Sequence, residues 1–397
     1  MNVPWGILAP LIAVVITFAA MQGAVALTDA IRRRDYRRFE DQNESAVALR
    51  FPLPTISPSA ADQQRKTLSP FWDIAHKAAG SAQTTYHNAV VRSAGCLVLA
   101  FLTLAFGALP PTDWPASARL DVASLELVLS WIEAIAILSM LVLFIYGRVT
   151  CRPWIASRTG AELLRQYQIL SVVLPGAFGA APIGDFKGRF DREARLIASN
   201  VQAGPGSAIA ERIDRFWLDR KASIENHALG ETDLTADALL VYLQRRARRQ
   251  LAWFADSKAR LEHISGRRNA ILTTLYCLAG GVALVKHGWL LSTGHSPAVL
   301  LPLLLIVTGL SAATTAYYIN QNSRSLIHRY HTQERSIAHW LTTFDQRWNF
   351  SSLPMAALDL VAKTEIRRHI LQFEDLMIDE LIDWIHITSY DAIELAP

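Results

Sequence analysis

Five long apolar stretches constrain what this 397-residue chain can fold into. A membrane-spanning helix needs about 20 consecutive apolar residues, with a range of about 17 to 25. Three stretches reach that length, and the other two are slightly shorter. The stretches are Trp5–Leu27, Ala94–Leu109, Leu125–Tyr146, Ala270–Val285 and Ala298–Ile319. They predict an all-α fold, an integral membrane helical bundle with five spans.

The two shorter stretches gain support from their neighbours. Stretches two and three are joined by residues 110–124, and stretches four and five by residues 286–297. Both connectors are rich in Pro, Gly or Ser, and each carries a tryptophan, Trp114 or Trp289. Tryptophan is enriched at the membrane–water interface. The pattern therefore predicts two tandem hairpins, each running in, out and in again.

The basic residues predict the orientation. Lys and Arg number 10 in residues 28–93, 20 in residues 147–269 and 7 in residues 320–397, whereas each hairpin connector carries one. Positive charge collects on the cytosolic side of membranes. We expect the N-terminus outside and the C-terminus in the cytosol. A cleaved signal peptide is the alternative for the first stretch, because Ala24–Ala26 resembles a cleavage site, although the arginines follow it instead of preceding it.

About two thirds of the chain lies outside the apolar stretches on the predicted cytosolic side, and its periodicity is helical. Pro153 suits a helix start. Loops are expected at 50–64, 174–188 and 202–208, which are rich in Pro, Gly or Ser. The predicted cytosolic helices are 73–92, 153–170, 209–227, 232–268 and 354–387.

The expected regions follow from these elements. They are an N-out anchor with a basic cytosolic segment (1–93), a first hairpin with its following helix (94–172), a cytosolic helical region (173–269), a second hairpin with its following helix (270–346), and a C-terminal cytosolic helix and tail (347–397). The order of helix, hairpin and helix recurs in 73–170 and 239–345, which indicates an internal repeat. The alternative is that any two helical hairpins look alike.

Composition excludes several classes of function. A net charge of +4 does not indicate a nucleic-acid partner, and three cysteines do not indicate a disulfide scaffold. The glycine-rich phosphate-binding motifs are missing, so no cofactor is expected. His328, His331 and Glu334 share a helix face, but no second cluster supports a metal. No catalytic triad arrangement is evident, and we expect no enzyme.

Two carboxylates fall in the third apolar stretch. Glu133 lies well inside it, and Glu126 lies seven residues earlier on the same helix face. A carboxylate in hydrocarbon is costly, so it should face the bundle interior or water. The functional interpretation is a pore-lining or gating group. The alternative is an interhelical hydrogen bond, with Glu126 at the membrane surface.

A second set of candidates lies on the predicted cytosolic helices. Spacings of three and four residues place one group on a single helix face, and a basic run precedes the fourth apolar stretch. The alternative for both is a solvated or paired charged face. The candidate docking or ligand residues are Trp154, Arg158, Glu162 and Arg165, and in the run Arg245 and Arg249, beside Arg246 and Arg248.

Four segments resemble a known family. They are WIASRTGAELLR (154–165), YHNAVVRS (86–93), RRQLAWFADSK (248–258) and the acidic C-terminal helix and tail from Glu374. They are similar to bacterial multi-pass membrane proteins related to the SMODS and SLOG-associating two-transmembrane effectors, known as SLATT. The resemblance implies a membrane effector of bacterial conflict systems that permeabilises the membrane, often beside enzymes making nucleotide signals. It also implies assembly into a homo-oligomer.

These observations lead to two hypotheses for a protein of the bacterial inner membrane. The first is a regulated pore-forming or membrane-disrupting effector, in which cytosolic helices respond to a cytosolic protein or a small nucleotide signal and move the hairpins. The second is a non-conducting scaffold or sensor that docks cytosolic partners. An intramembrane enzyme has only Glu133 and scattered histidines to support it.

Overall fold

The computed structural model describes residues 5–53, 58–107, 122–178, 186–201, 206–293, 299–319, 323–349 and 359–391. Every regular element in these residues is helical, which confirms the all-α prediction. The chain divides into two compact units, each assembled from three separated stretches. Unit 1 contains Met1–Tyr36, Thr85–Val149 and Arg260–Ser325, and unit 2 contains Arg37–Thr84, Thr150–Ala259 and Leu326–Pro397.

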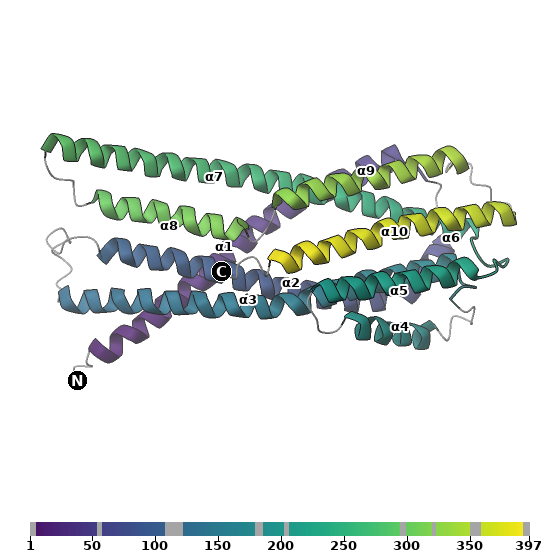
Figure 1. The fold of residues 1–397 in the computed structure, drawn as a ribbon, viewed down its shortest axis with the longest axis horizontal. Coiled ribbons are helices and arrows are strands. Elements are labelled where there is room, and N and C mark those ends of the chain that lie inside the picture. Colours follow the sequence, from purple (N-terminus) through teal and green to yellow (C-terminus); the bar gives the residue numbers. More distant parts are fainter. Residues whose placement is uncertain are drawn as a thin grey trace. The chain divides into compact units, whose positions relative to one another are not determined.

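Most of the helices are long (Figure 1). Several of them supply residues to both units. In chain order they are α1 (Trp5–Arg50), α2 (Pro58–Gly107), α3 (Val122–Val173), α4 (Phe186–Val201), α5 (Gly206–Asn226), α6 (Ala236–Tyr242), the π-helical turn η3 (Leu243–Arg248), α7 (Arg249–Thr293), α8 (Leu300–Ile319), α9 (Ser323–Trp348) and α10 (Leu360–Asp391).

Three helices in the described residues are long and apolar enough to cross a membrane. These helical stretches are Ala79–Ala105, Leu127–Val173 and Ala236–Ser292. Ile12–Thr28 and Leu300–Thr315 are shorter apolar helices. The number of crossings and the orientation stay predictions.

Small side chains let the helices of unit 1 approach closely. Ala13 of α1 is buried with Val128 and Ile132 of α3, and Leu99 of α2 packs against this cluster. Gly309 of α8 leaves no room for a methyl group beside Phe101 of α2. Close backbone approach through small residues is typical of helix packing in membranes, where association depends on van der Waals contact.

The outer surface of unit 1 is apolar. On α7, the side chains of Leu284 and Leu291 are each 75% exposed, and Trp289 is 52% exposed. On α3, Leu138 is 61% exposed. Soluble monomers rarely present large continuous apolar patches to water. This surface therefore fits a hydrocarbon environment better than an aqueous one.

Three sequence expectations about helix boundaries are wrong. Pro153, expected at a helix start, lies inside α3, where Cys151 and Ile155 are buried on either side of it. Packing of these neighbours holds the helix together although proline removes one backbone hydrogen bond. The expected loop at 50–64 is shorter, because α2 begins at Pro58, a favoured first helical residue. Helix α4 also begins within the expected loop 174–188.

Unit 2 has a core of aromatic and aliphatic side chains. Tyr242, Phe254, Phe344 and Phe373 are almost fully buried. Helix α10 packs along α5, as Figure 1 shows. Asp375 fixes this pair, because its carboxylate accepts hydrogen bonds from the indole Nε1 of Trp217 (2.8 Å) and from the Nζ of Lys221 (2.7 Å).

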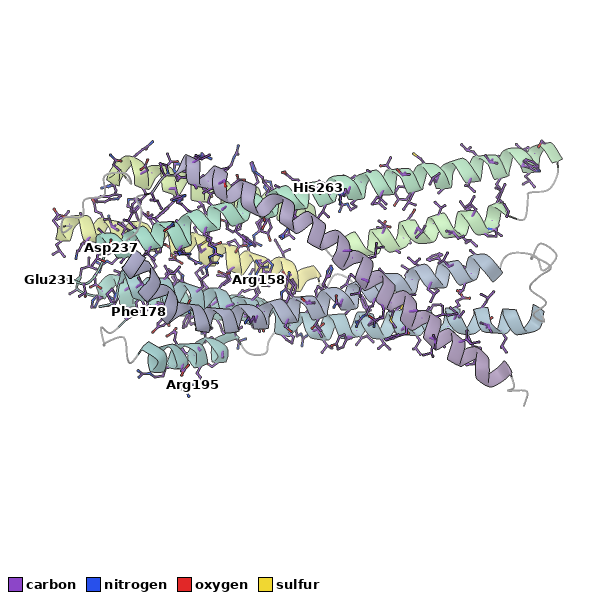
Figure 2. All side chains as sticks on the ribbon, turned by 180° about the vertical axis from the view of Figure 1, so that it is seen from behind. Arg158, Phe178, Arg195, Glu231, Asp237 and His263 are labelled. Atoms are coloured by element: carbon purple, nitrogen blue, oxygen red, sulfur yellow. The ribbon has the colours of Figure 1, made fainter. Side chains whose placement is uncertain are left out.

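One buried aspartate organises the turn between α5 and α6. The carboxylate of Asp233 accepts hydrogen bonds from the backbone N–H groups of Gly176 and Gly230, both at 2.8 Å. The next residue, Leu234, adopts a left-handed φ of 53° and donates its N–H to the carbonyl of Val173 at 2.8 Å. Figure 2 shows Phe178, Glu231 and Asp237 at this end of unit 2. The turn is thereby tied to the end of α3.

The close approach of α8 to α2 yields a test of unit 1. We expect Gly309→Ala to lower the free energy of unfolding by about 1–3 kcal/mol, because the new methyl group would collide with Phe101. Gly281→Ala is the matched control, since nothing lies within 4 Å of a Cβ at that position. It should be neutral or stabilising by up to about 1 kcal/mol through helix propensity. Thermal unfolding in detergent measures both, and equal effects would contradict the packing of α8 on α2.

Candidate functional site

A fully buried carboxylate lies at the centre of unit 2. Glu374 of α10 is 0% exposed. Its Oε1 accepts hydrogen bonds from the Tyr242 hydroxyl (2.8 Å) and the Arg246 Nε (3.1 Å). Its Oε2 accepts from the Arg246 Nη2 (2.8 Å) and the Gln166 Nε2 (3.1 Å). We call these four residues the Glu374 network.

The network joins elements that lie far apart in the sequence. Gln166 comes from α3, Tyr242 from α6, Arg246 from η3 and Glu374 from α10. A buried charge is costly unless a partner and further hydrogen bonds compensate it. The planar guanidinium of Arg246 supplies a two-pronged contact, which is the strong geometry for a carboxylate. The four elements must therefore keep one relative arrangement for Glu374 to keep these hydrogen bonds.

The π-helical turn η3 carries Arg246 into this position. Leu239, Leu243, Ala247 and Leu251 recur every four residues and are all buried. In a regular α-helix a four-residue repeat drifts by about 40° at each step. The wider turn at 243–248 cancels this drift and keeps the face continuous. Single π turns inside α-helices often mark functional positions.

Glu162, one of the candidates predicted from the sequence, lies beside the network. Its Oε2 is 3.6 Å from the Arg246 Nη1, and its Oε1 is 3.9 Å from the Arg165 Nη1. The Glu162 side chain is 37% exposed, whereas the Arg246 side chain is 3% exposed. Glu162 is thus a loose, solvent-accessible partner of two guanidinium groups, in contrast to the tightly bonded Glu374.

Trp154 and Arg158 form a second contact group with α10. The Arg158 guanidinium lies 4.2 Å from the ring centre of Trp384 and 5.9 Å from that of Trp253. Trp154 meets Trp384 edge to face at 5.3 Å. Such cation–π contacts contribute about 0.5–2 kcal/mol, most where water is excluded. Figure 2 shows Arg158 on α3. Trp154, Arg158 and Glu162 lie four residues apart on α3 and therefore share one helix face.

A further ion pair joins α9 to α10 beside this group. Arg329 donates through its Nη2 to the backbone carbonyl of Glu380, and the same nitrogen lies 3.5 Å from the Glu380 Oε1. Burial raises the pKa of the Glu380 carboxyl, although Arg158 and Arg329 act in the opposite direction. The neutral acid is therefore more populated here than at an exposed glutamate.

The remaining predicted residues divide between the units. Arg245 and Arg249 are exposed on unit 2, while Arg246 between them is buried. Glu133 is half-buried in unit 1, beside the buried Ile132. The side chain of Glu126 lies outside the described residues. The basic run contains Arg246, but its sequence pattern favours Arg245 and Arg249 as the candidate contacts.

The sequence did contain signals for the residues that were missed. The four-residue apolar repeat from Leu239 to Leu251 predicts a wide turn, and Arg246 adjoins its buried face. Glu374 follows Ile370 by four residues and precedes Ile378 by four, so a carboxylate falls on the apolar face of α10. A charge in that position calls for a buried partner.

The predicted histidine group is explained by pairing. Glu334 contacts Lys258 of α7, with the Lys258 Nζ 2.5 Å from the Glu334 Oε2, and lies 4.0 Å from the His331 Nδ1. Within the described ranges, no group of three or more histidine, cysteine or acidic side chains is arranged to hold a metal.

The Glu374 carboxylate has all its hydrogen-bond donors within the protein and is sealed from solvent. The Glu374 network is therefore suited to holding helices in register.

Comparison with protein-family models, with curated proteins and with solved structures finds no match to this chain.

Replacement of the buried carboxylate tests the network. We expect Glu374→Gln to cost about 3–5 kcal/mol of unfolding free energy, because the buried Arg246 is left with only the loose, half-exposed Glu162 as a charged partner. The exposed Glu225 of α5 offers a matched control, and Glu225→Gln should change stability by no more than about 0.5 kcal/mol. Denaturant unfolding in detergent, followed by tryptophan fluorescence, measures both. If a paired Arg246→Met and Glu374→Leu variant is no more stable than Glu374→Gln, unpaired charge is not the cause.

The raised pKa of Glu380 predicts a pH dependence. A carboxyl whose pKa is higher in the fold than in the unfolded chain stabilises the fold below its ordinary pKa. It loses that contribution as the pH rises through the raised value. From about pH 4.3 upward, the stability of Glu380→Gln relative to wild type should therefore increase. Melting temperatures of both proteins between pH 4 and 8 check this, and a constant difference would contradict it.

Proposed function

We propose that this protein is a regulated, pore-forming or membrane-disrupting effector of the bacterial inner membrane, whose apolar helices are controlled by unit 2. The observation that carries the proposal is that single helices belong to both units. Helix α3 contains the exposed apolar residues of unit 1 and the Gln166 contact to Glu374 in unit 2. Helix α7 continues directly from η3 into exposed apolar residues.

In this proposal the Glu374 network holds unit 2 in its resting arrangement. Two packed arrangements of the same helices can differ by only a few kcal/mol, and a ligand shifts the balance by its preference for one of them. Because α3 and α7 both contribute to unit 2, a change in their register there would move their apolar ends. The five-span topology, an external N-terminus, a cytosolic C-terminus and assembly into a homo-oligomer belong to this proposal, as does the resemblance to SLATT proteins.

Glu133 is the candidate lining or gating group. It is half-buried within the apolar part of α3, next to residues that pack against α1. Ionisable groups at such depth usually face a bundle interior or a water-filled path. A ring of carboxylates, contributed by several copies of the chain, would favour cations over anions.

A scaffold that docks cytosolic partners is the second candidate. Unit 2 carries exposed aliphatic side chains at the start of α10, where Leu360 is 63% and Val361 is 70% exposed. Adjacent aliphatic side chains at this exposure suit a protein contact. Copurification of a stoichiometric partner, together with no ion leak, would favour the scaffold over the pore.

Ion flux from proteoliposomes tests the pore. We expect Glu133→Gln to reduce cation flux several-fold, because it removes the charge that attracts cations, and Ser130→Ala, an exposed change on the same helix, to have no effect. Glu374→Gln should act in the opposite direction and raise basal flux, because it weakens the resting arrangement. Absence of flux from wild type and from Glu374→Gln alike would reject the pore.

A further inference from the structure

Positive charge is in excess beside the Glu374 network. The Glu162 carboxylate interacts electrostatically with Arg158, Arg165 and Arg246. Arg165 in turn interacts with Arg249 and with Glu374. Arg158 also interacts with Glu380. Arg165, Arg246 and Arg249 are thus left with two carboxylates, Glu162 and Glu374, and Glu374 is already saturated with hydrogen bonds. Among these five groups of the described residues, three positive charges face two negative ones.

Glu162 compensates these arginines only weakly. Its oxygens lie 3.6 Å and 3.9 Å from the nearest nitrogens of Arg246 and Arg165, which exceeds ordinary hydrogen-bond length. The Arg246 Nη1, which faces Glu162, is buried and makes no hydrogen bond within the described residues. A buried arginine nitrogen without an acceptor is costly. Arg212 and Arg329 also have such nitrogens, but the Arg246 nitrogen faces the half-exposed Glu162. A better acceptor than Glu162 would therefore bind with favourable energy.

We infer that Arg165, Arg246 and Arg249 form a binding site for a phosphate-bearing anion, and that Glu162 occupies the position of that anion in its absence. The inference identifies the kind of signal to which unit 2 responds, so its regulatory meaning rests on the proposed function. Binding itself does not depend on ion conduction. We call these four residues the arginine site.

The chemistry of phosphate suits the arginine site better than that of the resident carboxylate. A guanidinium fork matches two phosphate oxygens, and a phosphate group has a third oxygen for another donor. Glu162 offers two oxygens from a side chain fixed to α3. The site is open to solvent, since Glu162 is 37% exposed and Arg249 is exposed. A free anion can therefore reach the arginines from the side on which Glu162 is exposed.

Glu162 competes with the anion for the arginine site. Removal of an arginine and removal of the Glu162 charge should therefore change the anion affinity in opposite directions. Removal of an arginine takes away a donor and weakens anion binding. Removal of the Glu162 charge takes away the group that occupies the site and strengthens anion binding. A merely structural role for these residues would not produce an increase in affinity from Glu162→Gln.

Calorimetric titration of the full chain in detergent with inorganic pyrophosphate tests the site. Wild type should bind pyrophosphate, Arg249→Gln should bind about tenfold or more weakly, and Glu162→Gln should bind several-fold more tightly. Arg165→Gln should also bind weakly, and thermal melting shows whether it is folded. Arg215→Gln removes an exposed arginine from α5 as the charge-matched control, and it should bind as wild type does.

The outcomes separate this site from the proposed pore. The site is rejected if pyrophosphate does not bind, if Arg249→Gln binds as tightly as Arg215→Gln, or if Glu162→Gln binds more weakly than wild type. Binding with these signs but without ion flux supports the site and rejects the pore. Nanodiscs of phosphatidylglycerol and of phosphatidylcholine identify the source of the phosphate. Loss of pyrophosphate binding only in phosphatidylglycerol indicates a lipid headgroup, and equal binding in both indicates a soluble anion.

Discussion

The buried carboxylate of Glu374 is the interaction on which the arrangement of unit 2 depends. It draws its donors from α3, α6 and η3, while the neighbouring Asp375 draws its donors from α5. Glu374 and Asp375 are consecutive residues of α10, and their carboxylates attach this helix to its neighbours on two of its sides. A shift of α10 by one residue would turn both groups by about 100° and leave Arg246 and Trp217 without acceptors. Apolar packing alone tolerates a one-residue shift of α10 far better, so the two carboxylates specify the register of α10 against its neighbours.

The two units are both built from α-helices, but they differ in which side chains they expose and which they bury. Unit 1 exposes large apolar side chains such as Leu284 and Leu291, and its interior is built from small ones such as Ala13. Unit 2 buries polar groups such as Arg246 and Glu374 and pairs them completely or in part. A hydrocarbon environment removes the drive to hide apolar groups, whereas an aqueous one restores it. The overall composition of the chain therefore combines the apolar residues of unit 1 with the more polar residues of unit 2.

Features that depend on local sequence could be predicted, and features that depend on distant partners could not. The helical class and the apolar stretches follow from periodicity and hydropathy, which a short window contains. The shared face of Trp154, Arg158 and Glu162 follows from four-residue spacing. Their partner on α10, Trp384, did not follow, and neither did the acceptor of Arg246, which lies 128 residues further along the chain. Pro153 was misjudged because packing on both sides of it outweighs its local preference.

The pairing of Arg246 with Glu374 also has a consequence for biogenesis. A ribosome completes η3 long before it reaches α10, so the guanidinium emerges well ahead of its acceptor. Domains generally fold as their residues become available. The apolar segments on either side of η3 are therefore translated while unit 2 still lacks its central carboxylate. Translation order therefore leaves unit 2 without its finished interior until the last of its three stretches has been made. Only then can the Glu374 network fix the parts of α3 and α7 that belong to unit 2.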